Sequence, residues 1–150
     1  MSETPFRIRF LEAKDLDAVV AIDEKVLGSP RREYYETKFE KLFGSPDYVP
    51  VSLAAETEDG KLIGFVMAEL YIGQYGISQE GATLDTIGVD PDYQNLGVGQ
   101  KLIDELIAHL RKLGVERINT LVNWDDSRLI RFFSANGFAP SRTINLERQI

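Results

Sequence analysis

Residues 87–103 read IGVDPDYQNLGVGQKLI, and this stretch decides how the fold is interpreted. It runs from an apolar strand through the turn signal Asp90-Pro91 into a glycine-rich loop, and then into a helix. The loop, from Gln94 to Gly99, has the form Gln-x-x-Gly-x-Gly. The first backbone N–H groups of a helix lack intrahelical partners and carry a partial positive charge, and glycine lets a bulky anion approach them. The stretch therefore predicts a loop that binds a pyrophosphate.

Two other phosphate-binding motifs do not fit the same loop. A dinucleotide-binding fold requires Gly-x-Gly-x-x-Gly directly after a strand in a βαβ unit, and a P-loop ends in Gly-Lys followed by Ser or Thr. Neither pattern is present. A lone glycine pattern is also compatible with a tight turn that only starts a helix, so the elements around it must decide between these interpretations.

The chain before this loop alternates strands and helices. Apolar and charged residues alternate over 6–11, which predicts a half-buried strand, and two amphipathic helices follow, with Asp15 and Ser29 as expected N-caps. Two apolar runs, 48–57 and 61–72, flank a Glu-Asp-Gly turn and predict an antiparallel hairpin.

The next predicted strand, 82–89, contains a glycine. A glycine inside a strand, here Gly88, often marks a bulge or the close approach of another backbone. After the loop, leucines and isoleucines at helical spacing predict a helix over about 97–113. Three further elements are predicted: a short strand at 117–122, a helix at 126–136 and a last alternating strand at 143–150.

The length and composition favour one globular domain over residues 1–150. The 150 residues are 43% hydrophobic and 27% charged, and a chain of about 100 to 150 residues is typical of one core. The chain has no Cys and one His, which excludes disulfides, thiolate metal sites, a cysteine nucleophile and a His-rich metal site. We therefore expect no metal.

The charge is acidic and unevenly distributed. The net charge is −7; residues 1–100 contain nine Lys or Arg against eighteen Asp or Glu, whereas residues 101–150 contain eight against six. This balance argues against binding to nucleic acid or to an anionic membrane surface, which needs a basic face. The N-terminus lacks the pattern of a signal peptide, and the apolar run 62–68 is too short to span a membrane. We expect a soluble, cytoplasmic protein.

The glycine-rich segment resembles motif A of the GNAT superfamily, the N-acetyltransferases that use acetyl-CoA. The matching positions are Val89, Pro91, Tyr93, Gln94, Gly97 and Gly99. The order of elements along the chain is also similar, and Phe132–Phe138 resembles the aromatic-x-x-x-Gly-Phe that ends the family's fourth helix. The resemblance implies an α/β fold with a single mixed, mostly antiparallel sheet flanked by helices on both faces.

The resemblance also implies acetyl-CoA as the co-substrate. In the family, the strand before the loop separates from its neighbour at a bulge, for which Gly88 is the matching position, and the pantetheine arm pairs with the exposed backbone. This would place the backbones of Ile87, Gly88 and Val89 against the pantetheine and the thioester carbonyl, while the side chains of Ile87 and Val89 belong to the core. The pyrophosphate would be wrapped by the loop residues Gln94, Asn95, Leu96, Gly97, Val98, Gly99 and Gln100.

Two family positions on the fourth helix differ in this sequence. The tyrosine that often protonates the leaving thiolate is replaced by Phe133, which cannot donate a proton and is interpreted as a packing wall beside the thioester. Ser134, Tyr75 or a water could substitute, although a thiol with a pKa of about 8.5 is already a tolerable leaving group. An Asn that often contacts the cofactor is replaced by Asp126, which suits a helix cap equally well.

A general base is expected because an amine with a pKa of about 10.4 is mostly protonated at neutral pH. Asp85 is the first candidate, since it lies four residues before Val89, where the family frequently uses an acidic residue or a water that it holds. Glu69, on the preceding strand, is the second. Each could instead be a solvated residue on the open face of the sheet. Trp124 could line the acceptor entrance, although ordinary packing is the commoner role of such a residue.

These features lead to three hypotheses about function. The first is transfer of an acetyl group from acetyl-CoA to a primary amine by direct attack in a ternary complex, since a chain without Cys cannot form a cysteine acyl-enzyme. The second is a non-catalytic acyl-CoA-binding or regulatory module, which Phe133 keeps open. The third is a phosphate-binding protein unrelated to CoA.

The acceptor is expected to be a small-molecule or peptide amine, and the acidic part of the chain favours a cationic one. Glu33, Glu36, Glu69 and Glu80 are the candidates to steer it, and the family shapes its acceptor entrance with the second helix and the loop after the third strand. The alternative is that these acidic residues only keep the protein soluble. Dimers are common in the family, so the chain could also form a homodimer.

Overall fold

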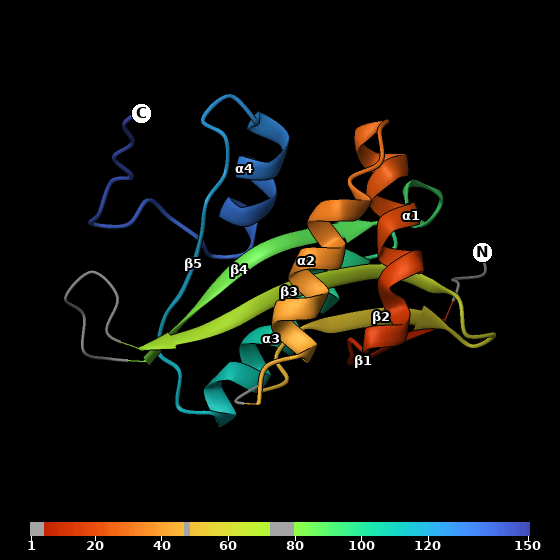
Figure 1. Cartoon of the computed structure of the whole chain (residues 1–150). Coiled ribbons are helices and arrows are strands. Elements are labelled where there is room, and N and C mark those ends of the chain that lie inside the picture. The colour runs from red at the N-terminus through yellow and green to blue at the C-terminus, as the bar shows by residue number, and fades with distance from the viewer. Residues whose placement is uncertain (1–4, 47–48, 73–79) are drawn as a thin grey trace.

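The computed structural model describes residues 5–46, 49–72 and 80–150, and these form one five-stranded sheet between two layers of helices (Figure 1). The strand order follows the chain; the first four strands pair antiparallel and the last pairs parallel. The strands are β1 (Phe6–Phe10), β2 (Leu53–Thr57), β3 (Leu62–Ile72), β4 (Glu80–Val89) and β5 (Ile118–Thr120). The predicted mixed, mostly antiparallel sheet with helices on both faces is confirmed.

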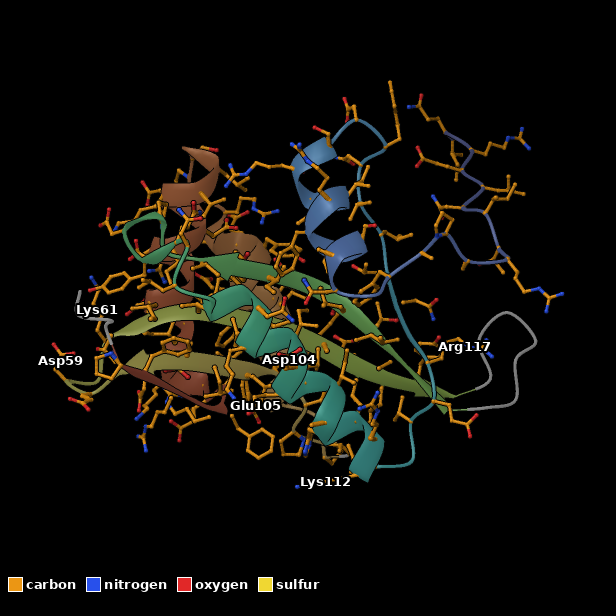
Figure 2. The ribbon with its side chains drawn as sticks, turned by 180° about the vertical axis from the view of Figure 1, so that it is seen from behind. Asp59, Lys61, Asp104, Glu105, Lys112 and Arg117 are labelled. Atoms are coloured by element: carbon orange, nitrogen blue, oxygen red, sulfur yellow. The ribbon has the colours of Figure 1, made fainter. Side chains whose placement is uncertain are left out.

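The helices divide between the two faces of the sheet. α1 (Leu16–Leu27) and α2 (Arg32–Phe43) cover one face, and α3 (Val98–Lys112) and α4 (Ser127–Ala135) lie on the other, which Figure 2 shows from behind. Two short 3-10 turns, η1 (Ala13–Asp15) and η3 (Pro91–Tyr93), precede α1 and α3.

Each layer of helices has its own core. Because successive residues of a strand point to opposite faces, β3 supplies Phe65 and Met67 to the core under α1 and α2, and Val66 and Ala68 to the core under α3. The strand is therefore apolar throughout its centre, as expected of a strand that is covered on both faces. This arrangement fixes β3 and its neighbour β4 between the two layers.

The boundaries of α2 differ from the sequence prediction. The helix was expected to start after Ser29, but it begins at Arg32, with Arg31 at the N-cap position. The guanidinium of Arg31 donates hydrogen bonds of 2.9 and 2.7 Å to the Asp23 carboxylate on α1. This contact between the two helices, which local turn chemistry does not encode, holds the residue just before α2 outside the helix.

The last predicted strand, 143–150, is not formed. Residues 139–150 follow α4 as an irregular segment, and all of them are exposed. Figure 1 shows this segment standing clear of β5, the outermost strand of the sheet. Alternation of apolar and polar residues predicts which face of a strand would be buried, but a strand also needs a neighbour to pair with.

Candidate active site

β4 and β5 separate from each other partway along β4. Their parallel pairing runs from Ala82 and Ile118 to Leu84 and Thr120, where the Thr120 hydroxyl donates a 2.9 Å hydrogen bond to the Leu84 carbonyl. β4 continues to Val89 after β5 has ended, so its backbone beyond Leu84 has no strand on that side within the described residues. Such an edge can pair with the amides of an extended ligand, as an added strand would.

A groove of about 100 Å³ lies where the two strands separate. It is lined by Leu84, Asp85, Thr86, Ile87, Thr120, Leu121, Leu129 and Phe133. The lining residues come from both strands, from the segment after β5 and from α4. Three of the predicted site residues, Asp85, Ile87 and Phe133, are thus brought together around one opening.

The glycine-rich loop ends at the start of α3, as predicted. Gly97 is the N-cap residue and adopts the left-handed conformation with φ of 79°, and no side chain caps the first turn. A Cβ added at Gly97 would meet no atom within 4 Å, so the space in front of the helix is open. The free N–H groups of this turn, beginning at Val98, are therefore available to an anion.

Asp90 holds the other end of this loop. Its side chain is 3% exposed, accepts a 2.9 Å hydrogen bond from the Asp92 N–H and lies 3.1 Å from the Lys25 ammonium on α1. Burial alone would raise the pKa of Asp90, but the Asp92 N–H and the Lys25 charge outweigh it and hold that pKa below its usual range. The loop is thereby anchored to α1 by an ionised carboxylate.

Gly99 permits close contact between α3 and α4. A Cβ at this position would lie 3.1 Å from the ring of Phe132, closer than side chains normally pack. The two glycines of the motif therefore do different things: Gly97 provides a backbone angle, and Gly99 provides room for an aromatic ring of the neighbouring helix. The need for glycine at position 99 thus comes from Phe132, which is more than thirty positions away in the chain.

The predicted bulge in β4 exists, but it lies at Asp85 and not at Gly88. Met67 pairs with Thr86 and Ala68 pairs with Leu84, which leaves Asp85 as the extra residue. Gly88 pairs regularly with Phe65, and a Cβ there would lie 2.8 Å from the Phe65 ring. The position requires glycine because a ring packs over it, so the interpretation of Gly88 as a bulge was wrong.

The bulge turns two successive side chains of β4 toward α2. Asp85 lies 3.2 Å from the ammonium of Lys38, and the Thr86 hydroxyl lies 3.5 Å from the hydroxyl of Tyr35. Lys38 and Tyr35 are three residues apart and therefore share one face of the helix. Without the extra residue, regular alternation would point Asp85 and Thr86 to opposite faces of the sheet.

Lys38 is the polar partner that the sequence analysis missed. The ion pair is largely buried, with 25% of the Lys38 side chain and 19% of the Asp85 side chain exposed. Burial lowers the pKa of Lys38, but the Asp85 carboxylate raises it by more, so the amine stays charged. Nothing in the local sequence links the two residues, since their contact depends on the docking of α2 over the bulge.

Tyr35 is buried, as predicted from its place on the helix. Its hydroxyl donates a 2.8 Å hydrogen bond to Asp23, which also accepts from Arg31. Burial raises the pKa of the Tyr35 hydroxyl, which therefore keeps its proton. Burial also disfavours ionisation of Asp23, but the hydrogen bonds from Arg31 and Tyr35 dominate and keep the pKa of that carboxyl below its usual range. This network ties α2 to α1 and to the bulge.

A second opening lies along α2. It has a volume of about 370 Å³ and is lined, among the described residues, by Glu33, Tyr34, Thr37, Lys38 and Lys41. Lys38 belongs to this opening and also contacts Asp85, which lines the groove between β4 and β5. The two openings are therefore linked through one ion pair.

On α4, two predicted site residues lie in well-defined surroundings. Phe133 is buried and its ring contacts the rings of Phe132 and Phe138, with centroids 5.4 and 5.0 Å apart. Asp126 caps α4, because its carboxylate accepts a 3.0 Å hydrogen bond from the Leu129 N–H. The packing of Phe133 and the capping by Asp126 are as expected. Their contacts with a cofactor stay predictions.

The remaining candidates are distributed around these openings. Ser134 and Glu69 are exposed, and Trp124 is almost fully exposed in the segment after β5. Ile87 and Val89 pack against the core under α3, as predicted for their side chains. Tyr75 lies outside the described residues, and the side chain of Glu80 is also outside them.

No group of three or more His, Asp or Glu side chains within residues 5–46, 49–72 and 80–150 is placed to hold a metal ion. None of the helices in the same ranges is long and apolar enough to cross a membrane.

Sequence comparison identifies related proteins. Residues 16–138 match the profile of the Acetyltransferase (GNAT) family. The [Ribosomal protein bS18]-alanine N-acetyltransferase of Escherichia coli K12 is 31% identical over 134 residues, which covers 87% of this chain and 79% of that protein. A mycothiol acetyltransferase of Propionibacterium freudenreichii is 33% identical over 90 residues, and the match spans only 27% of that longer protein.

Solved structures have the same fold. An aminoglycoside N-acetyltransferase, AAC(6')-Iy, in complex with CoA superimposes with a TM-score of 0.78 at 18% identity and covers 99% of this chain and 97% of its own. The E. coli ribosomal-protein-S18-alanine N-acetyltransferase has a TM-score of 0.73 at 26% identity and covers 91% of this chain and 79% of its own. With a profile match over most of its length and a relative above 30% identity, the chain belongs to the GNAT acetyltransferase family.

Proposed function

We propose that the protein transfers an acetyl group from acetyl-CoA to a primary amine, in a complex that holds both substrates at once. The observation that carries this proposal is the open backbone edge of β4 next to the uncapped N-terminus of α3. The edge of β4 suits an extended, amide-containing arm, and the N-terminus of α3 suits a pyrophosphate. Their order along the chain, strand edge and then helix start, is the order of these two groups in CoA.

The residues present fit acetyl-CoA. The backbones of Ile87, Gly88 and Val89 lie on the part of β4 that β5 leaves unpaired, where they would pair with the pantetheine arm. The loop from Gln94 to Gln100 would enclose the pyrophosphate, because its first helical N–H groups have no side-chain cap. Phe133 would form the apolar wall beside the thioester, and Asp126 would lie at the start of the same helix.

Asp85 is proposed to accept the proton of the attacking amine, directly or through a water. Its position supports this role because it lines the groove and pairs with Lys38, which lines the opening along α2. The neutral amine would form a C–N bond to the acetyl carbonyl carbon, the C–S bond would break, and the thiolate of CoA would leave. Lys38 holds the Asp85 carboxylate in position before the amine arrives.

The chain lacks a general acid at the position that the family often uses. Phe133 is packed among aromatic rings and has no proton to give. A thiol has a pKa of about 8.5, so its thiolate can leave near neutral pH without help, and the loss of an acid would cost at most about 10² to 10⁴-fold in rate. We therefore propose that transfer proceeds with direct departure of the thiolate or with protonation by water.

The acceptor is proposed to enter along α2. This opening carries Glu33 together with Lys38 and Lys41, and Lys38 is neutralised by Asp85. The related proteins act on an alanine of a ribosomal protein and on aminoglycosides, both of which present an amine. We propose a small-molecule or peptide amine, with a cationic one favoured by the net charge of −7.

A panel of amines with acetyl-CoA tests the proposal. It should contain an alanine-terminated peptide, an aminoglycoside, a polyamine and a neutral primary amine, each followed by release of free thiol at low and at high salt. We expect thiol release with at least one acceptor, and a rate that falls with salt for the cationic ones. Retention of CoA by the protein without thiol release for any amine would instead support a non-catalytic acyl-CoA-binding module.

A further inference from the structure

The Lys38 ammonium occupies surroundings that suit a cationic amine. It lies 3.2 Å from the Asp85 carboxylate and sits over the ring of Tyr34, 5.9 Å from the ring centroid. A carboxylate and an aromatic face both attract an ammonium group. Only 25% of the Lys38 side chain is exposed, so the amine is held at one place inside the protein instead of moving freely in solvent.

The partner of this amine is the residue proposed to accept protons. A general base acts on a proton whose heavy atom lies within about 2.6 to 3.2 Å of it, and the Nζ atom of Lys38 meets this condition with respect to Asp85. Lys14, Lys25 and Lys101 also pair with carboxylates in the described part of the chain, but none of those carboxylates lines the groove between β4 and β5.

The ion pair connects the two openings of the candidate active site. Asp85 and Phe133 line the groove in which the thioester is proposed to lie. Lys38 lines the opening along α2, through which the acceptor is proposed to enter. When that opening holds no acceptor, the primary amine beside the base belongs to the protein itself.

We infer that the protein acetylates its own Lys38 when acetyl-CoA is bound and no acceptor amine is present. This inference rests on the proposed function, since it uses the same acetyl donor and the same base. The Lys38 ammonium gives one proton to Asp85, and the neutral Nζ forms a C–N bond to the acetyl carbonyl carbon while the C–S bond breaks. The thiolate of CoA leaves, the second proton of the nitrogen passes to water, and an acetyl-lysine remains.

This reaction should be slow and should occur once per chain. Burial lowers the pKa of Lys38, but the charge of Asp85 and its hydrogen bond raise it by more, so the neutral amine is scarce. Acetylation turns the ammonium into an uncharged amide, which cannot react again and no longer forms an ion pair with Asp85.

Mass spectrometry of the full chain after incubation with acetyl-CoA alone tests the inference. We expect one acetyl group, which peptide mapping places on Lys38. Lys38→Arg keeps a positive charge beside Asp85 but has no primary amine, and it should abolish the modification. Asp85→Asn removes the base and should slow the modification at least tenfold, with circular dichroism showing that the variant is folded.

Lys14 is the matched control for spontaneous acetylation. Its ammonium lies 3.3 Å from the Glu12 carboxylate, and its side chain is 74% exposed, so a reaction in free solution would modify it faster than Lys38. Lys14→Arg should leave the acetylation of Lys38 unchanged. A short acetyl thioester without the pyrophosphate cannot use the loop before α3, and it should modify Lys38 no faster than Lys14.

Two results overturn the inference in the wild-type chain: Lys38 stays unmodified, or acetyl-CoA modifies Lys38 and Lys14 at equal rates. Undiminished acetylation of Lys38 in a folded Asp85→Asn variant also overturns it. Thiol release with the amine panel, measured on the same preparation, decides the proposed function separately. Release of thiol with an amine while Lys38 stays unmodified would reject self-acetylation and leave the proposed function intact.

Discussion

Gly97 shows how far the loop that is proposed to bind the pyrophosphate depends on a single backbone angle. Gly97→Val forces a branched residue into the left-handed region and fills the space before α3. We expect the affinity for acetyl-CoA, measured by calorimetry, to fall at least tenfold, or about 1.4 kcal/mol. Gly114→Val introduces the same backbone strain beyond the far end of α3, at φ of 81°, and should reduce stability but not affinity. An unchanged affinity for acetyl-CoA in a folded Gly97→Val variant would contradict the proposal that this loop binds the cofactor.

Asp85 combines a proposed catalytic role with a structural ion pair, and the two can be separated. Asp85→Asn should lower turnover at neutral pH more than it changes the affinity for acetyl-CoA. It also leaves Lys38 without its partner, which should reduce the free energy of unfolding by between about 1 and 3 kcal/mol.

The double variant Asp85→Asn/Lys38→Gln is the control for this prediction. It removes both charges, so urea unfolding should show recovered stability while turnover stays low. Wild-type rates in Asp85→Asn from about pH 6 to pH 9 would eliminate Asp85 as the base.

Phe133 provides a gain-of-function test. If its ring lies beside the leaving sulfur, Phe133→Tyr adds a proton donor there, and turnover should be unchanged or higher. Phe132→Tyr, one residue earlier on α4 and packed near Gly99, should not raise turnover. A large loss of stability and activity in Phe133→Tyr would show that the ring cluster with Phe138 has no room for a hydroxyl.

At the scale of the element, α2 is held in place by polar contacts as well as by its apolar face. Tyr35→Phe removes the hydroxyl that donates to Asp23 and contacts Thr86 on the bulge. Because hydrogen bonds to charged groups contribute about 1.5 to 3 kcal/mol, we expect a loss of that order in the free energy of unfolding.

Tyr35→Phe should weaken the use of the acceptor amine more than the use of acetyl-CoA. α2 lines the proposed acceptor opening, so Tyr35→Phe should raise the KM for the amine more than the KM for acetyl-CoA. Tyr34→Phe, on the adjacent and more exposed tyrosine, serves as the stability control and should change unfolding by less than about 0.5 kcal/mol. Equal stability of the two variants would mean that the hydroxyl network does not hold the helix.

At the scale of the whole molecule, four buried carboxyls, Asp15, Asp23, Glu56 and Asp90, influence how stability responds to acid. Hydrogen bonds from Arg7 and Arg9 hold the pKa of Glu56 below its usual range. Burial opposes ionisation of Asp15, Asp23 and Asp90, but Arg9, Arg31, Lys25 and backbone N–H groups outweigh it, and all three folded-state pKa values lie below the usual range. The unfolded chain therefore binds protons at a higher pH than the folded one.

The sign of the pH effect follows from this difference. The stabilisation from the three Asp carboxyls is fully present above their unfolded pKa of about 3.9 and is lost as the pH falls through the lower folded values. Urea unfolding at a series of pH values should show stability falling steeply over that acidic range, with a smaller slope in Asp23→Asn. A free energy of unfolding that does not change over this pH range would show that these ion pairs contribute nothing to stability.

The sequence by itself determined the glycine-rich loop before α3 and the order of the elements around it. Gly97, the strand before it and the amphipathic α3 are specified by local rules, because turn residues and apolar periodicity act over a few positions and do not depend on distant neighbours. For the same reason the turn between β2 and β3 and the end of α1 at Gly28 were predicted in place, although β2 begins at Leu53 and not at the predicted residue 48.

The tertiary structure alone decided which residues meet. It put the bulge at Asp85, turned that carboxylate toward Lys38, and set Phe65 over Gly88 and Phe132 over Gly99. Each of these contacts joins segments far apart in the chain, and register and packing between whole elements fix them, so no local pattern reveals them. Residues 143–150 show the same limit: their alternation is that of a strand, but in the structure they pair with no other strand.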